Sequence, residues 1–91
     1  MRRAARRDAT EKDVVRAFRD AGFSVEFISG DGTPDLVIGK GPCMRWVEIK
    51  SGNKPLRDSQ IAWAESWRGP TPLIVRSVDD AIAVIQGWAS I

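Results

Sequence analysis

Two short apolar runs, DLVIG at residues 35–39 and MRWVEIK at residues 44–50, constrain the fold of this chain more than any other feature. The GKGP segment between them contains residues typical of tight turns, so the two runs are predicted to form an antiparallel hairpin. Both runs carry charge, namely Asp35 in the first and Glu48 and Lys50 in the second. Charged side chains rarely lie beside a core unless they are paired or hold a metal ion. The hairpin is therefore the first candidate for a functional site.

The N-terminal third of the chain is predicted to form one helix and one strand. Thr10 and Asp13 form a weak capping box, and Gly22 ends the helix. Residues 23–28 alternate with the period of a half-buried strand. The apolar stripe of this helix is Val14, Val15 and Phe18, headed by Glu11, and the buried side of the strand is Phe23, Val25 and Phe27.

After the hairpin, the pattern predicts a helix, a short strand and a last helix. Asp58 or Ser59 can cap the first of these helices, LIVR at residues 73–76 reads as the strand, and Ser77 with Asp80 forms a capping box for the last helix. The predicted stripes are Gln60, Trp63, Ala64 and Trp67 in one helix, and Val78, Ala81, Ile82 and Ile85 in the other.

The resulting order, αβββαβα, predicts an α/β fold with a mixed central β-sheet flanked by helices. A chain of 91 residues has room for one core. We expect residues 1–9 to form a basic N-terminal arm that need not be ordered, and residues 10–91 to form a single domain. The 43% apolar and 29% charged residues are typical of a soluble protein. No apolar run approaches the roughly 20 residues of a membrane span, and none follows the basic start as in a secretory signal, so we expect a cytoplasmic protein without a membrane partner.

The composition also restricts the chemistry. The chain has no histidine and a single cysteine, Cys43. An intrachain disulfide and a cysteine-based zinc site are therefore excluded, and the commonest general base is missing. Catalysis would have to rest on carboxylates, Lys, Ser or Thr. A bound metal would be a hard cation held by oxygen atoms, such as Mg²⁺ or Mn²⁺.

The charged residues of the hairpin suit phosphodiester hydrolysis. Side chains alternate along a strand, so Glu48 and Lys50 share one face with Trp46, and Asp35 at the start of the partner strand lies within reach of Glu48. Two carboxylates can share a divalent cation, and an adjacent ammonium can stabilise the transition state. However, E-x-K on an exposed strand is often a solvated ion pair, and Pro-Asp is common in turns. A surface without function is therefore the alternative for each motif alone.

Two polar residues outside the hairpin support the functional interpretation. Glu11 and Gln60 each head the apolar stripe of a predicted helix, which directs both side chains at the sheet. For Glu11, the alternative is a carboxylate that only stabilises the positive end of the helix dipole. The combination of both residues with the charged hairpin is harder to explain by chance.

These residues resemble the PD-(D/E)xK nuclease superfamily, and more closely its virus-type replication-repair nuclease (VRR-Nuc) domain. Pro34 and Asp35 are followed thirteen residues later by the E-x-K triplet. The closing LIVRSVDDAIAVI is similar to the last strand and helix of that family, so the resemblance spans residues 10–86. The motif positions, in order, are Glu11, GTPD at residues 32–35, EIK at residues 48–50, and SQ at residues 59–60.

The resemblance implies a restriction-endonuclease-like core and a stand-alone form of the domain, as found in bacteriophages, which would act in the host cytoplasm. It further implies a homodimer that cuts branched DNA such as Holliday junctions, with Mg²⁺ or Mn²⁺ as cofactor. Lys50 would position the attacking water, Gln60 would support the active site, and Glu11 would be an outer or second metal contact. The implied catalytic residues are Asp35, Glu48, Lys50 and Gln60, and the implied metal ligands are Glu11, Asp35, Glu48 and the backbone carbonyl of Ile49.

Several further residues have open interpretations. The arginines near the N-terminus contact DNA phosphates or belong to a solvated tail, and the basic residues of the loop after Lys50 are phosphate contacts or ordinary loop charges. Trp67 or Trp88 is expected in a dimer interface, and Trp46 either packs or stacks on DNA. The candidate DNA-binding residues are Arg2, Arg3, Arg6, Arg7, Lys54 and Arg57.

Three functions follow from these observations. The first is a metal-dependent endonuclease that acts on branched or structured DNA. The second is a sequence-specific restriction-type nuclease, against which the small size of the chain argues, because little surface is left to read bases. The third is a basic DNA-binding module without catalytic activity, in which the acidic residues are structural.

Overall fold

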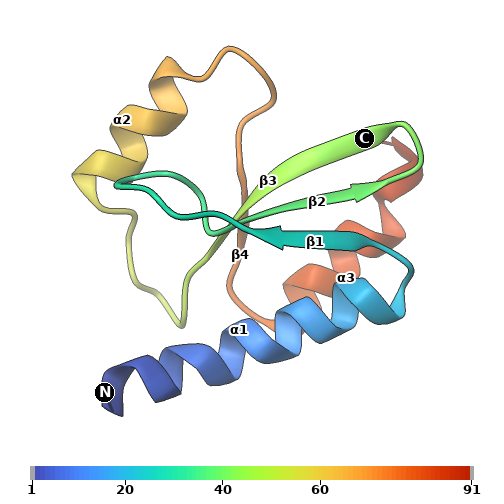
Figure 1. The fold of residues 1–91 in the computed structure, drawn as a ribbon, viewed down its shortest axis with the longest axis horizontal. Coiled ribbons are helices and arrows are strands. Elements are labelled where there is room, and N and C mark those ends of the chain that lie inside the picture. Colours follow the sequence, from blue (N-terminus) through green and yellow to red (C-terminus); the bar gives the residue numbers. More distant parts are fainter. Residues whose placement is uncertain (1, 91) are drawn as a thin grey trace.

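The computed structural model describes the backbone of residues 2–90 and the side chains of residues 10–89. The chain forms an α/β domain with a mixed four-stranded sheet and three α-helices (Figure 1). The elements, in order, are α1 (Arg2–Asp20), β1 (Ser24–Phe27), β2 (Leu36–Lys40), β3 (Cys43–Ile49), α2 (Asp58–Ser66), β4 (Leu73–Val75), α3 (Val78–Gln86) and the 3₁₀ turn η1 (Trp88–Ser90). This order confirms the predicted αβββαβα arrangement.

The sheet has the strand order β1-β2-β3-β4. Strands β2 and β3 form the predicted antiparallel hairpin, in which Leu36 lies opposite Val47. β1 is antiparallel to β2, whereas β4 is parallel to β3, with Val47 opposite Leu73. The α2 segment provides the crossover that a parallel strand requires.

One face of the sheet carries the hydrophobic core. Helices α1 and α3 lie against this face (Figure 1). The predicted stripe of α1 is confirmed, because Val14, Val15 and Phe18 are all buried. From the sheet, the core receives Phe23, Val25, Leu36, Ile38, Val47 and Val75.

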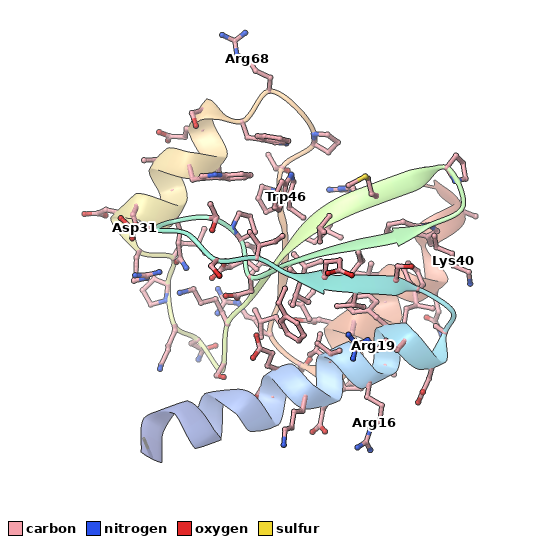
Figure 2. The ribbon with its side chains drawn as sticks, in the orientation of Figure 1. Arg16, Arg19, Asp31, Lys40, Trp46 and Arg68 are labelled. Carbon is pink, nitrogen blue, oxygen red and sulfur yellow. The ribbon has the colours of Figure 1, made fainter. Side chains whose placement is uncertain are left out.

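Helix α2 lies on the other side of the sheet from α1 and α3 (Figure 1) and leaves part of this face exposed, as at Met44 and Ile74. Trp46 projects from β3 toward this helix (Figure 2). Its ring packs edge-to-face on Trp63 and Trp67 of the α2 segment, with centroid distances of 5.2 and 5.4 Å. The packing of these aromatic side chains holds α2 against the sheet.

The structure corrects three details of the sequence prediction. α1 begins at Arg2 rather than Thr10, since the intervening Ala and Arg residues favour a helix and no Gly or Pro interrupts them. Phe27 is 56% exposed because it ends an edge strand with no strand beyond it. In α3, Val78 and Ile82 are exposed, and the side facing the core consists of Ala81, Val84 and Ile85, continued by Trp88.

Among residues 2–90, no helix combines the length and the apolar character that a membrane crossing requires. The side chains of Arg2, Arg3, Arg6 and Arg7 lie outside the described residues, so their predicted contacts with DNA stay predictions.

Candidate functional site: a carboxylate pair at the end of the hairpin

The register of the hairpin brings Asp35 beside Glu48. Leu36 pairs with Val47, so the preceding Asp35 lies at the level of Glu48, as the sequence predicts. The carboxylate of Asp35 accepts a hydrogen bond from the backbone N–H of Ile49 through Oδ2, at 2.8 Å. The side chain of Asp35 is therefore oriented by the strand that carries Glu48.

Glu48 is held by a buried polar contact. Its side chain lies on the α2 face of β3, and the residue is only 4% exposed. Its Oε2 accepts a hydrogen bond of 2.6 Å from Nε2 of Gln60, and the Nζ of Lys50 lies 3.9 Å from the same oxygen. These two contacts give the carboxyl group of Glu48 a defined position.

Gln60 connects this carboxylate to the start of α2. Its Oε1 accepts a hydrogen bond from the backbone N–H of Arg57, at 2.8 Å. Arg57, rather than Asp58 or Ser59, is the N-cap residue, and Gln60 takes the position at which a capping-box Glu or Gln satisfies the cap N–H. The two ends of the amide thus have different partners, which accounts for a glutamine that is only 8% exposed.

The environment of Glu48 disfavours its charge. The pKa of Glu48 is raised from 4.5 to about 7, chiefly by burial and further by the negative charge of Asp35. The positive charges of Lys50 and Arg57 lower the pKa of Glu48, but they do not outweigh the burial. A cation bound between the two carboxylates would favour the charged form of Glu48.

The predicted site residues outside the N-terminal segment line a single cavity of about 620 Å³. Lys54 and Arg57 enter it from the loop between β3 and α2, and both are exposed. Glu11 reaches the same cavity from α1 and Gln60 reaches it from α2. The predicted residues that the structure brings together in this way are Glu11, Asp35, Glu48, Ile49, Lys50, Lys54, Arg57 and Gln60.

The donor atoms at the end of the hairpin fit a hard divalent cation. Asp35, Glu48 and the carbonyl of Ile49 would supply oxygen ligands, which Mg²⁺ and Mn²⁺ prefer. Among the described side chains, no three Asp, Glu, Cys or His residues form a group that could hold a metal, so Glu11 does not complete a cluster with the other two carboxylates. Mg²⁺ usually binds one or two carboxylates and keeps several waters, which suits a pair.

The tryptophans of the chain are mostly engaged with each other or with the core. Trp63 and Trp67 stack at 5.0 Å, and Trp67 remains 41% exposed. Trp88 packs edge-to-face on Phe23 and donates a hydrogen bond from Nε1 to the carbonyl of Lys40, at 3.1 Å. Of the two tryptophans expected in a dimer interface, Trp88 is therefore committed to its own chain, whereas Trp67 keeps an exposed surface.

Arg76 contributes to the site although the sequence pattern does not single it out. Its Nη1 donates hydrogen bonds to the carbonyls of Gly52 and Lys54, at 3.0 and 2.8 Å. The backbone N–H of Arg76 donates to Asp80 at the start of α3. Arg76 therefore ties the loop that carries Lys54 to the end of β4. No sequence signal could have revealed this role, because backbone carbonyls distant in the chain are its acceptors.

Replacing Gln60 by Ala is expected to destabilise the chain by about 1–2 kcal/mol. The change leaves both Glu48 Oε2 and the N–H of Arg57 without the partner that the amide supplies. Urea unfolding in the presence of EDTA measures the free energy of unfolding. Gln86→Ala, on the exposed side of α3, is the matched control. Equal losses in the two variants would show that the amide of Gln60 has no structural role.

Taken together, the cavity offers two oriented carboxylates, an ammonium and two further cations from one loop. Such a site can hold a divalent cation and a phosphate group side by side. Compared with known proteins, the chain gives no match to a family model, to a curated protein or to a solved structure.

Proposed function

We propose that this chain is an endonuclease that hydrolyses phosphodiester bonds of DNA with the help of Mg²⁺ or Mn²⁺. The observation that carries the proposal is the meeting of Asp35 and Glu48 at the end of the hairpin, with Lys50 in the same cavity. A buried carboxylate beside a second carboxylate is unfavourable by itself, and a cation between them would relieve this cost. This relief supports a metal-binding role for the pair over a purely structural one.

Each residue of the site has a role in this reaction. A cation held by Asp35, Glu48 and the Ile49 carbonyl would lower the pKa of a bound water and neutralise charge on the phosphate. The ammonium of Lys50 orients the attacking water and stabilises the negative charge that develops on the phosphate oxygens. Gln60 keeps the Glu48 carboxylate in place through its 2.6 Å hydrogen bond. Lys54 and Arg57 bind phosphates that flank the bond to be cut.

The wider assignment is also part of the proposal. We infer a restriction-endonuclease-like core similar to the VRR-Nuc domain. Three antiparallel strands followed by a helix and a strand parallel to β3 support this inference, as does the pair of carboxylates at the end of the hairpin. A homodimer would set two such sites against the two symmetric strands of a four-way junction. Branched DNA is therefore the proposed substrate, and the exposed part of Trp67 is the candidate contact between the protomers.

The experiment that tests this function uses the full chain on a labelled four-way junction, beside a linear duplex of the same sequence. Mg²⁺, Mn²⁺ and EDTA are compared. We expect metal-dependent cuts at symmetric positions of the junction, which are lost in Asp35→Asn. The matched control is Asp31→Asn, because Asp31 is exposed in the same β1–β2 loop (Figure 2) and lies outside the cavity.

The possible results separate the parts of the proposal. Equal cutting of the linear duplex would retain hydrolysis but remove the preference for junctions. Binding of DNA without cutting in any metal would replace the nuclease by a DNA-binding module without catalytic activity. Cutting by Asp35→Asn at the normal rate would show that the carboxylate pair is not the active site.

A further inference from the structure

A second hollow lies beside the proposed active site, between α1 and β1. Its volume is about 600 Å³. Six of its lining residues come from α1, and the seventh, Phe27, ends the edge strand β1. The residues that line it are Glu11, Lys12, Val15, Arg16, Arg19, Asp20 and Phe27, and we refer to it as the α1–β1 groove.

The positive charges of the groove lie along one side of α1. Lys12, Arg16 and Arg19 follow each other at intervals of four and three residues, the spacing of neighbours on a helix surface. All three are exposed, and no ion pair to another described residue engages any of them. Both arginines project from α1, and Arg16 points away from the sheet (Figure 2). Arg19 also donates to the carbonyl of Val25, at 3.5 Å, which keeps it near β1.

The other wall of the groove presents an aromatic ring. Phe27 is 56% exposed, although it lies opposite Leu36, which is fully buried. The groove thus places one exposed aromatic ring next to three cations. Phosphate groups would pair with the three cations, and a nucleobase would stack on the ring of Phe27. One nucleic-acid strand would therefore contact both walls of the groove.

The groove adjoins the proposed active site at Glu11. Glu11 lines both the groove and the cavity of Asp35 and Glu48. From Lys12 to Arg19 the helix advances by roughly 10 Å, so the three cations can contact a short stretch of one strand. A strand that follows these cations would therefore arrive at the carboxylate pair.

We propose that the α1–β1 groove binds an unpaired DNA strand that leads to the bond to be cut. Lys12, Arg16 and Arg19 contact successive phosphates, and Phe27 stacks on one base. A paired duplex cannot provide this contact because its bases are stacked inside the helix, so the groove gives a preference for the single strand next to a branch. The inference extends the proposed nuclease function by naming the part of the substrate that this surface recognises.

The test measures binding by fluorescence anisotropy in EDTA, with the full chain and a labelled single strand, a forked duplex and a blunt duplex. The variants are Phe27→Ala and the double change Lys12→Glu with Arg16→Glu. Met44→Ala and Arg68→Glu are the matched controls, since both residues are exposed and lie outside the groove. Arg68 lies far from α1, beyond α2 (Figure 2). Phe27→Trp should keep the stacking, and thermal melts verify that each variant is folded.

We expect Phe27→Ala to weaken binding of the single strand and the fork roughly tenfold, with no change for the blunt duplex. The Phe27→Trp variant should bind the single strand and the fork like the unchanged protein. The charge reversals should weaken binding of the single strand and reduce its dependence on salt. The inference is overturned if the groove variants bind like the controls, or if Phe27→Ala weakens duplex binding equally. EDTA prevents cleavage, so the binding result does not depend on whether the nuclease proposal holds. Groove variants that both bind and cut DNA normally would overturn this inference alone.

Discussion

Lys50→Ala is expected to lower the rate of DNA cleavage at least about 100-fold while DNA binding stays within about twofold of the unchanged protein. The ammonium of Lys50 stabilises charge that develops on the phosphate in the transition state, so its loss affects the reaction more than the binding of the substrate. Single-turnover cleavage with Mg²⁺, together with anisotropy in EDTA, measures the two quantities separately.

The controls for this prediction address the packing of the lysine. The side chain of Lys50 is only 12% exposed, so its stem also contributes to packing. Lys50→Met keeps most of this stem and should lose cleavage to the same extent as Lys50→Ala. Arg68→Ala removes a cation from an exposed loop and should cut normally. Cleavage by Lys50→Met within a few-fold of the normal rate would exclude the ammonium from the chemical step.

Glu48→Gln is expected to stabilise the metal-free chain at pH 8 by roughly 3 kcal/mol. The pKa of Glu48 is about 7 in the folded chain, against an ordinary value of 4.5. Below about pH 4.5 the carboxyl is neutral in both the folded and the unfolded state, so the raised pKa has no cost. As the pH rises from 4.5 to 7, the unfolded chain releases the proton first, and stability is lost until the folded form also ionises.

Glutamine removes this dependence on pH because it cannot ionise, and its side-chain oxygen can still accept the hydrogen bond from Gln60. Urea unfolding in EDTA at pH 4 and pH 8 measures the effect, and Glu65→Gln on the exposed side of α2 is the control. Mg²⁺ should raise the melting temperature of the unchanged protein at pH 8 and that of Glu48→Gln much less. A variant that gains nothing at pH 8, or that responds to Mg²⁺ like the unchanged protein, would contradict the proposed role of Glu48.

The local parts of this fold could be predicted well from the sequence. The turn chemistry of GKGP specifies the β2–β3 hairpin, and strand alternation within it brings Asp35 and Glu48 together. The stripe of Val14, Val15 and Phe18 is likewise determined by the helical period. Because Gln60 heads its own helix, the same period directed it at the sheet, where it meets Glu48.

In α3, the helical period alone does not determine which side of the helix faces the core. Val78, Ala81, Ile82 and Ile85 fit one helical stripe, and Ala81, Val84, Ile85 and Trp88 fit another. Only packing against the core selects the second stripe, because Val84, Ile85 and Trp88 meet the core there. The exposure of Phe27 has a similar origin, since nothing in the alternation of residues 23–28 tells that β1 lies at the edge of the sheet.

The sequence by itself therefore determined the order of elements, the hairpin and the residues that could carry chemistry. These features depend on residues near each other in the chain, whose spacing has a direct meaning in a helix or strand. The tertiary structure alone decided the burial of Glu48, the hydrogen bond from Arg76 to the loop that carries Lys54, and the groove between α1 and β1. Each of these depends on residues far apart in the chain, which only the packing of the helices on the sheet brings into contact.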